Sequence, residues 1–345
     1  MKYRNLLFIF LLSVFASCSK DPELEPDTPP STFKVRIDNV IHETYFDSYP
    51  QGPSLFVPYL VMSGLPEGEK LLAFGGYYSP ENPNPDGSDY TFIHDCAEDE
   101  LIQGWDWTQE LIYSAGWIDL PIPGKTYYFK GVVRTNKAVY YSNTVTINTD
   151  GLPGYTPGPQ DRVLPVVFHV MPRKDGTYPH PYFFDEMLAC ANRLYRNVWP
   201  LPGLADAGIR FVPATHAPDG TALSTPGIHY LDERYELDLD ISNEELRQWV
   251  GDNLWEMTEV INVWVSPFIN DHIVSEDTST AGFTFLPYFA PEEMLQGCNT
   301  AVPGCFSGIF LNQEIVGNGY CNSGIAVFAH EAGHYLGLEI GRAHV

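Results

Sequence analysis

The stretch His330-Glu331-Ala332-Gly333-His334-Tyr335-Leu336-Gly337-Leu338 decides which fold this chain of 345 residues is expected to have. It follows an apolar run, residues 325–329 (IAVFA), that is typical of a buried helix. Side chains four residues apart lie on one face of a helix, so His330 and His334 can direct imidazole nitrogens at one zinc ion. Glu331 is then placed to act as general base on a metal-bound water. The stretch therefore predicts a zinc-binding catalytic helix; the alternative is a chance match in an ordinary amphipathic helix.

Gly337 indicates which kind of zinc site the helix is expected to carry. It stands where a helix would end in a left-handed turn, and H-E-x-x-H-x-x-G begins the long zinc signature of the metzincin peptidases. The chain resembles this family through Leu338 and then departs from it, because the family's third histidine would fall at Ile340. The resemblance implies a zinc endopeptidase, and the missing third ligand implies that the chain as given is inactive.

The last seven residues, 339–345 (EIGRAHV), suggest why the signature breaks off. They are what the DNA GAG ATC GGA AGA GCA CAC GTC encodes, and from its second base this string reads as a widely used short-read sequencing adapter. We expect the natural gene to continue past Leu338, with histidine at position 340 and, further on, a methionine-containing turn. The alternative is a genuine C-terminus that lost its third ligand. His344 does not fit the metzincin spacing in either case.

The beginning of the chain predicts export. Lys2 and Arg4 precede an apolar run, residues 6–15, that is too short to span a bilayer as a stable helix. Small residues then lead into Cys18, which resembles the lipobox of bacterial lipoproteins. We expect residues 1–17 to be a lipoprotein signal peptide, Cys18 to carry lipid, and 18–32 to be an acidic, Pro-rich tether. The alternative is an ordinary secretory signal with an incidental cysteine.

This reading predicts an outer-membrane lipoprotein of a Gram-negative cell envelope, facing the surface or the periplasm. The formal net charge of −25 argues against nucleic-acid binding, because a phosphate backbone would be repelled. Without Cys18 an odd number of cysteines remains, and Cys298 with Cys305 is our first guess for a local disulfide. The sequence sets neither an oligomeric state nor a natural substrate. The remaining cysteines are Cys96, Cys190 and Cys321.

Residues 33–149 are expected to form an all-β sandwich of the fibronectin type III or immunoglobulin kind. Short segments alternate at period two and are separated by Gly, Pro or Asn. The hairpin pattern across 125–147 resembles the last two strands of fibronectin type III-like modules. Three tryptophans (Trp105, Trp107 and Trp117) are expected to be packing residues, with an exposed glycan platform as the alternative. A Gly/Pro linker, 150–161, ends the domain. The expected strands are 33–37, 55–61, 71–78, 126–134 and 138–147.

Residues 162–338 are expected to form an incomplete α/β domain with a mixed, twisted sheet and the zinc helix at its end. The near-continuous apolar run 163–171 predicts a strand buried on both faces, in which His169 is expected to be a hydrogen-bonded core residue. A helix is expected over 183–199, and another from Ser242, which forms a capping box with Glu245. Acidic residues over 232–245 suit a solvated face, and a calcium site there is possible but unsupported. Further strands are expected at 260–265, 281–287 and 307–311.

Segments 165–170, 261–265 and 282–287, together with the zinc helix, resemble the pappalysin-type, cytophagalysin-like metzincins. In that family an edge strand beside the cleft pairs with an extended peptide, which implies substrate-binding roles for Ala281, Gly282, Phe283 and Thr284. The alternative is a purely structural strand.

The resulting prediction is a zinc endopeptidase that acts on a protein or peptide substrate behind a β-sandwich spacer. The main competitor is a non-catalytic lipoprotein that binds glycan or protein through the sandwich. Glu331 discriminates between them, because a binding module of peptidase descent need not retain it. Gly337 argues against other kinds of zinc hydrolysis on the same helix.

Overall fold

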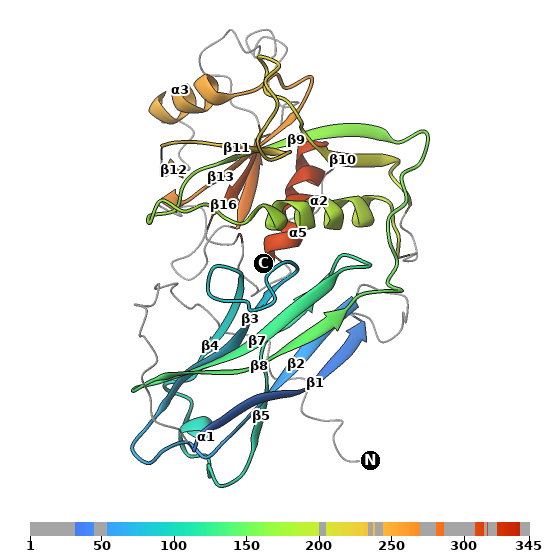
Figure 1. Cartoon of the computed structure of the whole chain (residues 1–345). Helices are drawn as coiled ribbons and strands as arrows, with labels where there is room; N and C mark the ends of the chain where they lie inside the picture. The colour runs from blue at the N-terminus through green and yellow to red at the C-terminus, as the bar shows by residue number, and fades with distance from the viewer. Residues whose placement is uncertain are drawn as a thin grey trace.

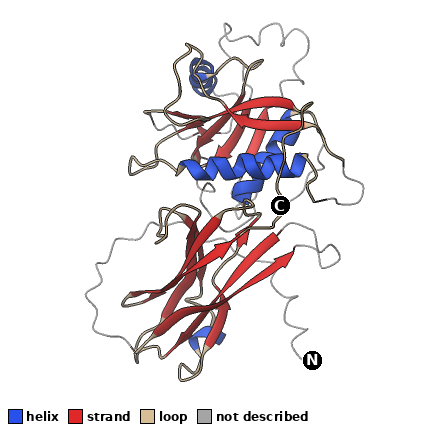
Figure 2. Ribbon diagram, turned by 45° about the vertical axis from the view of Figure 1, so that its right-hand side comes forward, coloured by secondary structure: helices blue, strands red, loops and turns tan. Residues whose placement is uncertain are grey.

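The computed structural model describes residues 32–44, 54–199, 205–233, 237–238, 244–269, 281–285, 308–313, 316 and 323–338. They form a lower domain of strands and an upper domain in which helices cover a sheet (Figures 1 and 2). The expected signal peptide, nearly all of the tether with Cys18, the Cys298–Cys305 pair and residues 339–345 lie outside the described residues. No helix of the described part is long and apolar enough to cross a membrane.

The lower domain consists of two antiparallel sheets that face each other (Figure 2). Glycine is required where they approach, because a Cβ on Gly131 would lie 2.4 Å from Leu60 Cδ1 of the opposite sheet. One sheet has the order β1–β2–β5, with β6 also pairing β2, and the other has the order β4–β3–β7–β8. The strands are β1 Lys34–Thr44, β2 Ser54–Ser63, β3 Leu71–Ser79, β4 Tyr90–Asp95, β5 Leu111–Ser114, β6 Ile118–Asp119, β7 Thr126–Thr135 and β8 Val139–Asn148.

The expected hairpin is confirmed, because β7 pairs antiparallel with β8. The tryptophans differ from one another: Trp107 packs edge-on against Phe33 at 5.9 Å, and Trp117 packs against Phe92 at 4.6 Å. Trp105, in contrast, is 38% exposed. It follows α1 (Glu100–Gln103), a single turn whose N-terminus is capped by the Asp99 carboxylate. Packing therefore accounts for two of the three indole rings.

The upper domain is built on the expected mixed sheet, with the order β10–β9–β13–β16–β15 and β11 on the outer side of β9. All pairs are parallel except β15 with β16. The interior strands are Val-, Ile- and Phe-rich because helices and loops cover both faces. The strands are β9 Arg162–Val170, β10 Ile209–Pro213, β11 Ile228–Tyr230, β13 Ile261–Ser266, β15 Gly282–Phe285 and β16 Gly308–Asn312, and β12 (Leu237–Asp238) separately pairs β14 (Phe268–Ile269).

Three helices accompany this sheet: α2 Pro181–Tyr195, α3 Glu244–Asn253 and α5 Ser323–Tyr335. The predicted helix over 183–199 is shifted, because Pro181 suits the first helical turn and Asn197 adopts a positive φ of 47°. Ser242, the proposed cap of α3, lies outside the described residues. Phe168 of β9 contacts Phe184 of α2 and Phe328 of α5, so these two helices share one face of the sheet.

The opposite face carries a row of rings that runs in register from β11 through β9, β13 and β16 to β15. His229 lies beside His169, whose ring stacks on Trp264 at 4.3 Å. Trp264 lies parallel to Phe310 at 6.1 Å, and Phe310 stacks on Phe283 at 4.8 Å. The row therefore fixes the edge strand β15 to the centre of the sheet.

Helix α2 also joins the two domains, since it lies across the end of the sandwich (Figure 1). The Tyr127 hydroxyl donates to Glu186 Oε1 at 2.5 Å, and the Tyr182 hydroxyl donates to Asp89 Oδ1 at 2.8 Å. The Arg193 guanidinium donates to the carbonyl oxygens of Leu120 and Pro121. Glu186 and Arg193 are both buried, and burial raises the pKa of the carboxyl and lowers that of the guanidinium. The sandwich is thus packed onto α2 rather than separated from it as a spacer.

Candidate catalytic metal site

Helix α5 lies against the sheet and α2, as its apolar first half requires. Phe328 has no exposed surface and contacts Phe168 and Phe211. The Tyr195 hydroxyl at the end of α2 donates to the carbonyl oxygen of Ala329 at 3.1 Å. This bond fixes the helical turn immediately before His330.

His330 and His334 approach each other on the partly exposed side of α5. Their Nε2 atoms are 3.1 Å apart, and the ring planes are 87° from parallel. Two histidines bound to tetrahedral zinc at about 2.0–2.1 Å would place their nitrogens about 3.3 Å apart. Burial, followed by the neighbouring His334, lowers the pKa of His330 and favours the neutral form that binds metals. The pair fits two corners of a zinc site.

The described residues supply no more than these two ligands. Within those residues, no group of three or more His, Cys, Asp or Glu side chains is placed to hold a metal ion. Ile340, where the metzincin signature would have its third histidine, lies outside them. His169, which was expected to be a core residue and not a ligand, lies in the row of rings on the other face of the sheet.

Glu331 turns toward the edge strand and is only 6% exposed. Its Oε2 accepts a hydrogen bond from Thr284 Oγ1 at 2.7 Å. Burial raises the pKa of this carboxyl, and the Thr284 bond and the nearby His334 oppose that rise. The site therefore combines a pair of imidazoles with a shielded carboxyl on the same helix.

Gly337 ends α5 in a Schellman turn. Its φ is +81°, its N–H donates to the His334 carbonyl at 2.8 Å, and the Leu338 N–H donates to the Gly333 carbonyl at 2.9 Å. A Cβ at Gly337 would meet nothing within 4 Å, so glycine is needed for the backbone angle and not for space. The chain leaves the helix directly after the second imidazole.

The four residues expected to bind a peptide lie at the edge of the sheet. Ala281 precedes β15, and Gly282, Phe283 and Thr284 belong to it. Strand β15 pairs β16, and no strand of the described residues pairs its other side. Sequence reasoning considered only the backbone here and missed the side-chain contact of Thr284 with Glu331. The usable signal was the period of two, which puts Gly282 and Thr284 on one face.

His169 confirms the expectation of a hydrogen-bonded core histidine. Its Nε2 lies 2.9 Å from Asn262 Oδ1, and its Nδ1 lies 2.9 Å from His229 Nδ1. Burial lowers its pKa to about 3. The ring is therefore neutral at physiological pH and belongs to the core.

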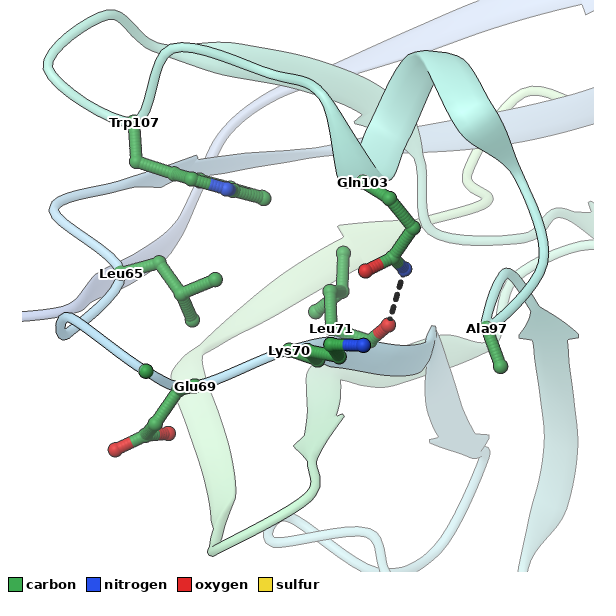
Figure 3. Close-up of a pocket in the computed structure, with 8 residues that line it drawn as sticks. Leu65, Glu69, Lys70, Leu71, Ala97, Gln103 and Trp107 are labelled. Carbon is green, nitrogen blue, oxygen red and sulfur yellow. Dashed lines mark hydrogen bonds between the residues drawn. The ribbon is translucent and has the colours of Figure 1, made fainter.

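A hollow of about 440 Å³ lies in the sandwich and includes no residue of the upper domain (Figure 3). Trp107 and Leu65 face it on one side, and Gln103 lies on another side, where its Nε2 donates a hydrogen bond to the Leu71 carbonyl at 2.6 Å. Its position separates it from the candidate metal site.

The solved structures that resemble part of this chain include two from one organism. Mature mirolysin of Tannerella forsythia in complex with a cleaved peptide is 16% identical, with a TM-score of 0.38, and the match covers 52% of this chain and 64% of that one. A promirolysin variant of the same organism is 16% identical, with a TM-score of 0.38 and coverage of 54% and 58%. The chain thus spans less than two thirds of either protein. No protein-family model and no curated protein matches the sequence. Likeness at this level carries no argument about activity, which has to be inferred from the site.

Proposed function

We propose that this protein is a zinc-dependent endopeptidase, with its metal on His330 and His334 and its general base at Glu331. The observation that carries the proposal is the convergence of the two Nε2 atoms to 3.1 Å beside a buried glutamate. A chance H-E-x-x-H sequence in an amphipathic helix has no reason to bury its glutamate while both imidazoles stay partly exposed. The pattern suits a metal that faces solvent and a base that is shielded from it.

In the proposed peptide hydrolysis, the metal and the side chains have separate roles. Bound zinc supplies a Lewis acid that polarises the scissile carbonyl and makes a water acidic. Glu331 accepts the proton from the attacking water and returns it to the leaving amine. The free side of β15 offers backbone N–H and C=O groups to an extended peptide, which would add a further strand to the sheet.

We further assign the upper domain to the pappalysin-type metzincins and the lower one to fibronectin type III-like modules. The signature through Gly337 and the antiparallel edge strand on an otherwise parallel sheet support the first assignment. The strand orders β1–β2–β5 and β4–β3–β7–β8 support the second. Lipidation at Cys18 and an outer-membrane location complete the proposal, and labelling with a palmitate analogue, compared with Cys18→Ala, tests the lipidation.

The competing function is glycan or protein binding by a non-catalytic lipoprotein. The hollow in the sandwich favours it, because Trp107, although it packs against Phe33, also lines this hollow. The buried Glu331 favours the peptidase, since a binding protein gains nothing from keeping this carboxyl beside the imidazole pair.

The two functions are separated by variants in a chain carrying Ile340→His, which completes the three-histidine set of the signature. In that chain Glu331→Gln should keep zinc and lose about 10²–10⁴-fold in the rate of peptide cleavage, because the carboxylate is base and not ligand. His334→Ala should lose both zinc and cleavage. Chelator-insensitive cleavage, or undiminished cleavage by Glu331→Gln, would refute the peptidase assignment.

A further inference from the structure

Glu331 is held from two sides by one strand. Thr284 Oγ1 lies 2.7 Å from Glu331 Oε2 and 3.0 Å from the Glu331 carbonyl oxygen. Both acceptors belong to the same residue, although Thr284 is 47 positions away in the chain. The hydroxyl therefore bridges the carboxylate and the helix backbone that carries it.

Gly282, two residues earlier on the same face of β15, confines the aliphatic part of the side chain. A Cβ at Gly282 would lie 3.1 Å from Glu331 Cγ, 2.9 Å from Val327 Cγ1 and 3.0 Å from the Phe310 carbonyl oxygen. The strand can pass this close to α5 only because the position is glycine. Glu331 is thus confined by backbone along its stem and by a hydroxyl at its tip.

The strand that does this is itself fixed. Phe283 points to the opposite face, where its ring stacks on Phe310 at 4.8 Å with only 7° between the planes. Phe310 in turn lies parallel to the fully buried Trp264. The position of Thr284 is therefore set by the sheet interior, although the strand lies at the sheet edge.

The Thr284 hydroxyl has a single proton to donate. The shorter contact, 2.7 Å, is to Glu331 Oε2, and the Glu331 carbonyl oxygen at 3.0 Å is the second acceptor within reach of the same proton. The carboxylate oxygen is therefore the main acceptor of this hydroxyl.

We propose that Thr284 is the positioning residue of the site, and that its hydroxyl holds the Glu331 carboxylate in place and couples it to the peptide-binding edge strand. Its catalytic meaning rests on the proposed function, but the positioning contact itself does not. A peptide added along β15 would lie on the strand that also orients the base. The same strand, β15, would then align both the bound peptide and the Glu331 carboxylate.

The contact is tested first in the metal-free full chain, without any assay of activity. Thr284→Val keeps the shape and removes the hydroxyl, whereas Thr284→Ser keeps the hydroxyl. In a double-mutant cycle with Glu331→Leu, urea unfolding should show that Thr284→Val shifts the unfolding equilibrium about tenfold more when Glu331 is present. Thr284→Ser should retain most of the coupling. Thr144→Val, at an exposed position of β8, is the matched control and should show none.

The second readout is the ¹³C NMR resonance of the Glu331 side-chain carboxyl, which reports its surroundings directly. It should shift in Thr284→Val and stay near its original position in Thr284→Ser. Zero coupling with an unchanged resonance in Thr284→Val would overturn the proposal. If coupling and shift are present but the Ile340→His chain binds zinc no more tightly than the Ile340→Ala chain, the proposed function fails while the positioning contact stands. If cleavage occurs, kcat should fall in Thr284→Val with KM little changed, and Thr284→Ser should restore it.

Discussion

At the scale of single residues, local periodicity predicts some residues of the candidate site and gives no information about others. His330, Glu331 and His334 were identifiable because helical spacing is a local property, and the structure puts all three on α5. Thr284 was not identifiable, because its partner is 47 residues away and strand register is not local information. His169 was placed correctly in the core, since it interrupts a run that only a buried strand explains.

His169 should make the protein sensitive to acid. Its folded pKa of about 3 lies below the unfolded value near 6.5, so only the unfolded chain takes up its proton between these values. The stability contributed by the neutral ring is complete above pH 6.5 and is lost as pH falls toward 3. We expect this residue to lower the free energy of unfolding by about 2 kcal/mol between pH 7.5 and pH 5. Urea unfolding at both values should show a flatter pH dependence for His169→Phe, and an unchanged dependence would contradict the assignment.

At the scale of elements, strand existence was easier to predict than strand neighbours. The alternating segments of β3, β7 and β8 were evident in the sequence, whereas β4 and β5 were missed, because they are short and lie in polar, turn-rich stretches. The end of α2 was overestimated, since the apolar stripe continues to Trp199 after the helix has stopped at Tyr195. The end of α5 was readable, because a glycine at that position signals a left-handed turn.

Gly337→Ala tests the turn that ends α5. Nothing lies within 4 Å of the added Cβ, so the cost should come from the positive φ alone and amount to about 1–2 kcal/mol. Amide hydrogen exchange should rise at Leu336 and Leu338, whose environment depends on the turn. Gly251→Ala, in the interior of α3 with similar open space, is the control and should be neutral or stabilising. Equal effects of the two substitutions would contradict the account.

At the scale of the whole molecule, composition and the Gly/Pro linker predicted two domains, but they did not predict how the sandwich and α2 pack together. A linker sequence suggests independence, whereas the structure buries Glu186 and Arg193 between α2 and the sandwich. Glu186 lies 59 residues from its partner Tyr127, and Arg193 lies 72 residues from its partner Pro121. Contacts between residues so far apart in the chain cannot be predicted from local sequence patterns. Because α2 also bonds to α5 through Tyr195, the sandwich supports the helix that carries the site.

Tyr127→Phe tests whether the two domains stabilise each other. It removes the donor to the buried Glu186 and should cost about 1–3 kcal/mol of unfolding free energy. Tyr141→Phe, on an exposed ring of the neighbouring strand β8, should cost little. The protein should unfold in one transition followed equally by fluorescence and by far-ultraviolet circular dichroism. Two separate transitions, with Tyr127→Phe affecting only the first, would show that the domains fold independently.

We propose that α5 carries two ligands of a catalytic zinc site and that a histidine at position 340, after the Gly337 turn, would be the third. This proposal is tested most directly by measuring zinc affinity, by competition with a chromophoric chelator, for Ile340→His against Ile340→Ala. Partners that only orient a ligand are worth 10–100-fold in metal affinity, so a direct ligand should raise it by at least about tenfold. We expect that gain for Ile340→His and its loss when His334→Ala is added. Equal affinities for the two position-340 variants, or a gain that survives His334→Ala, would contradict the proposal.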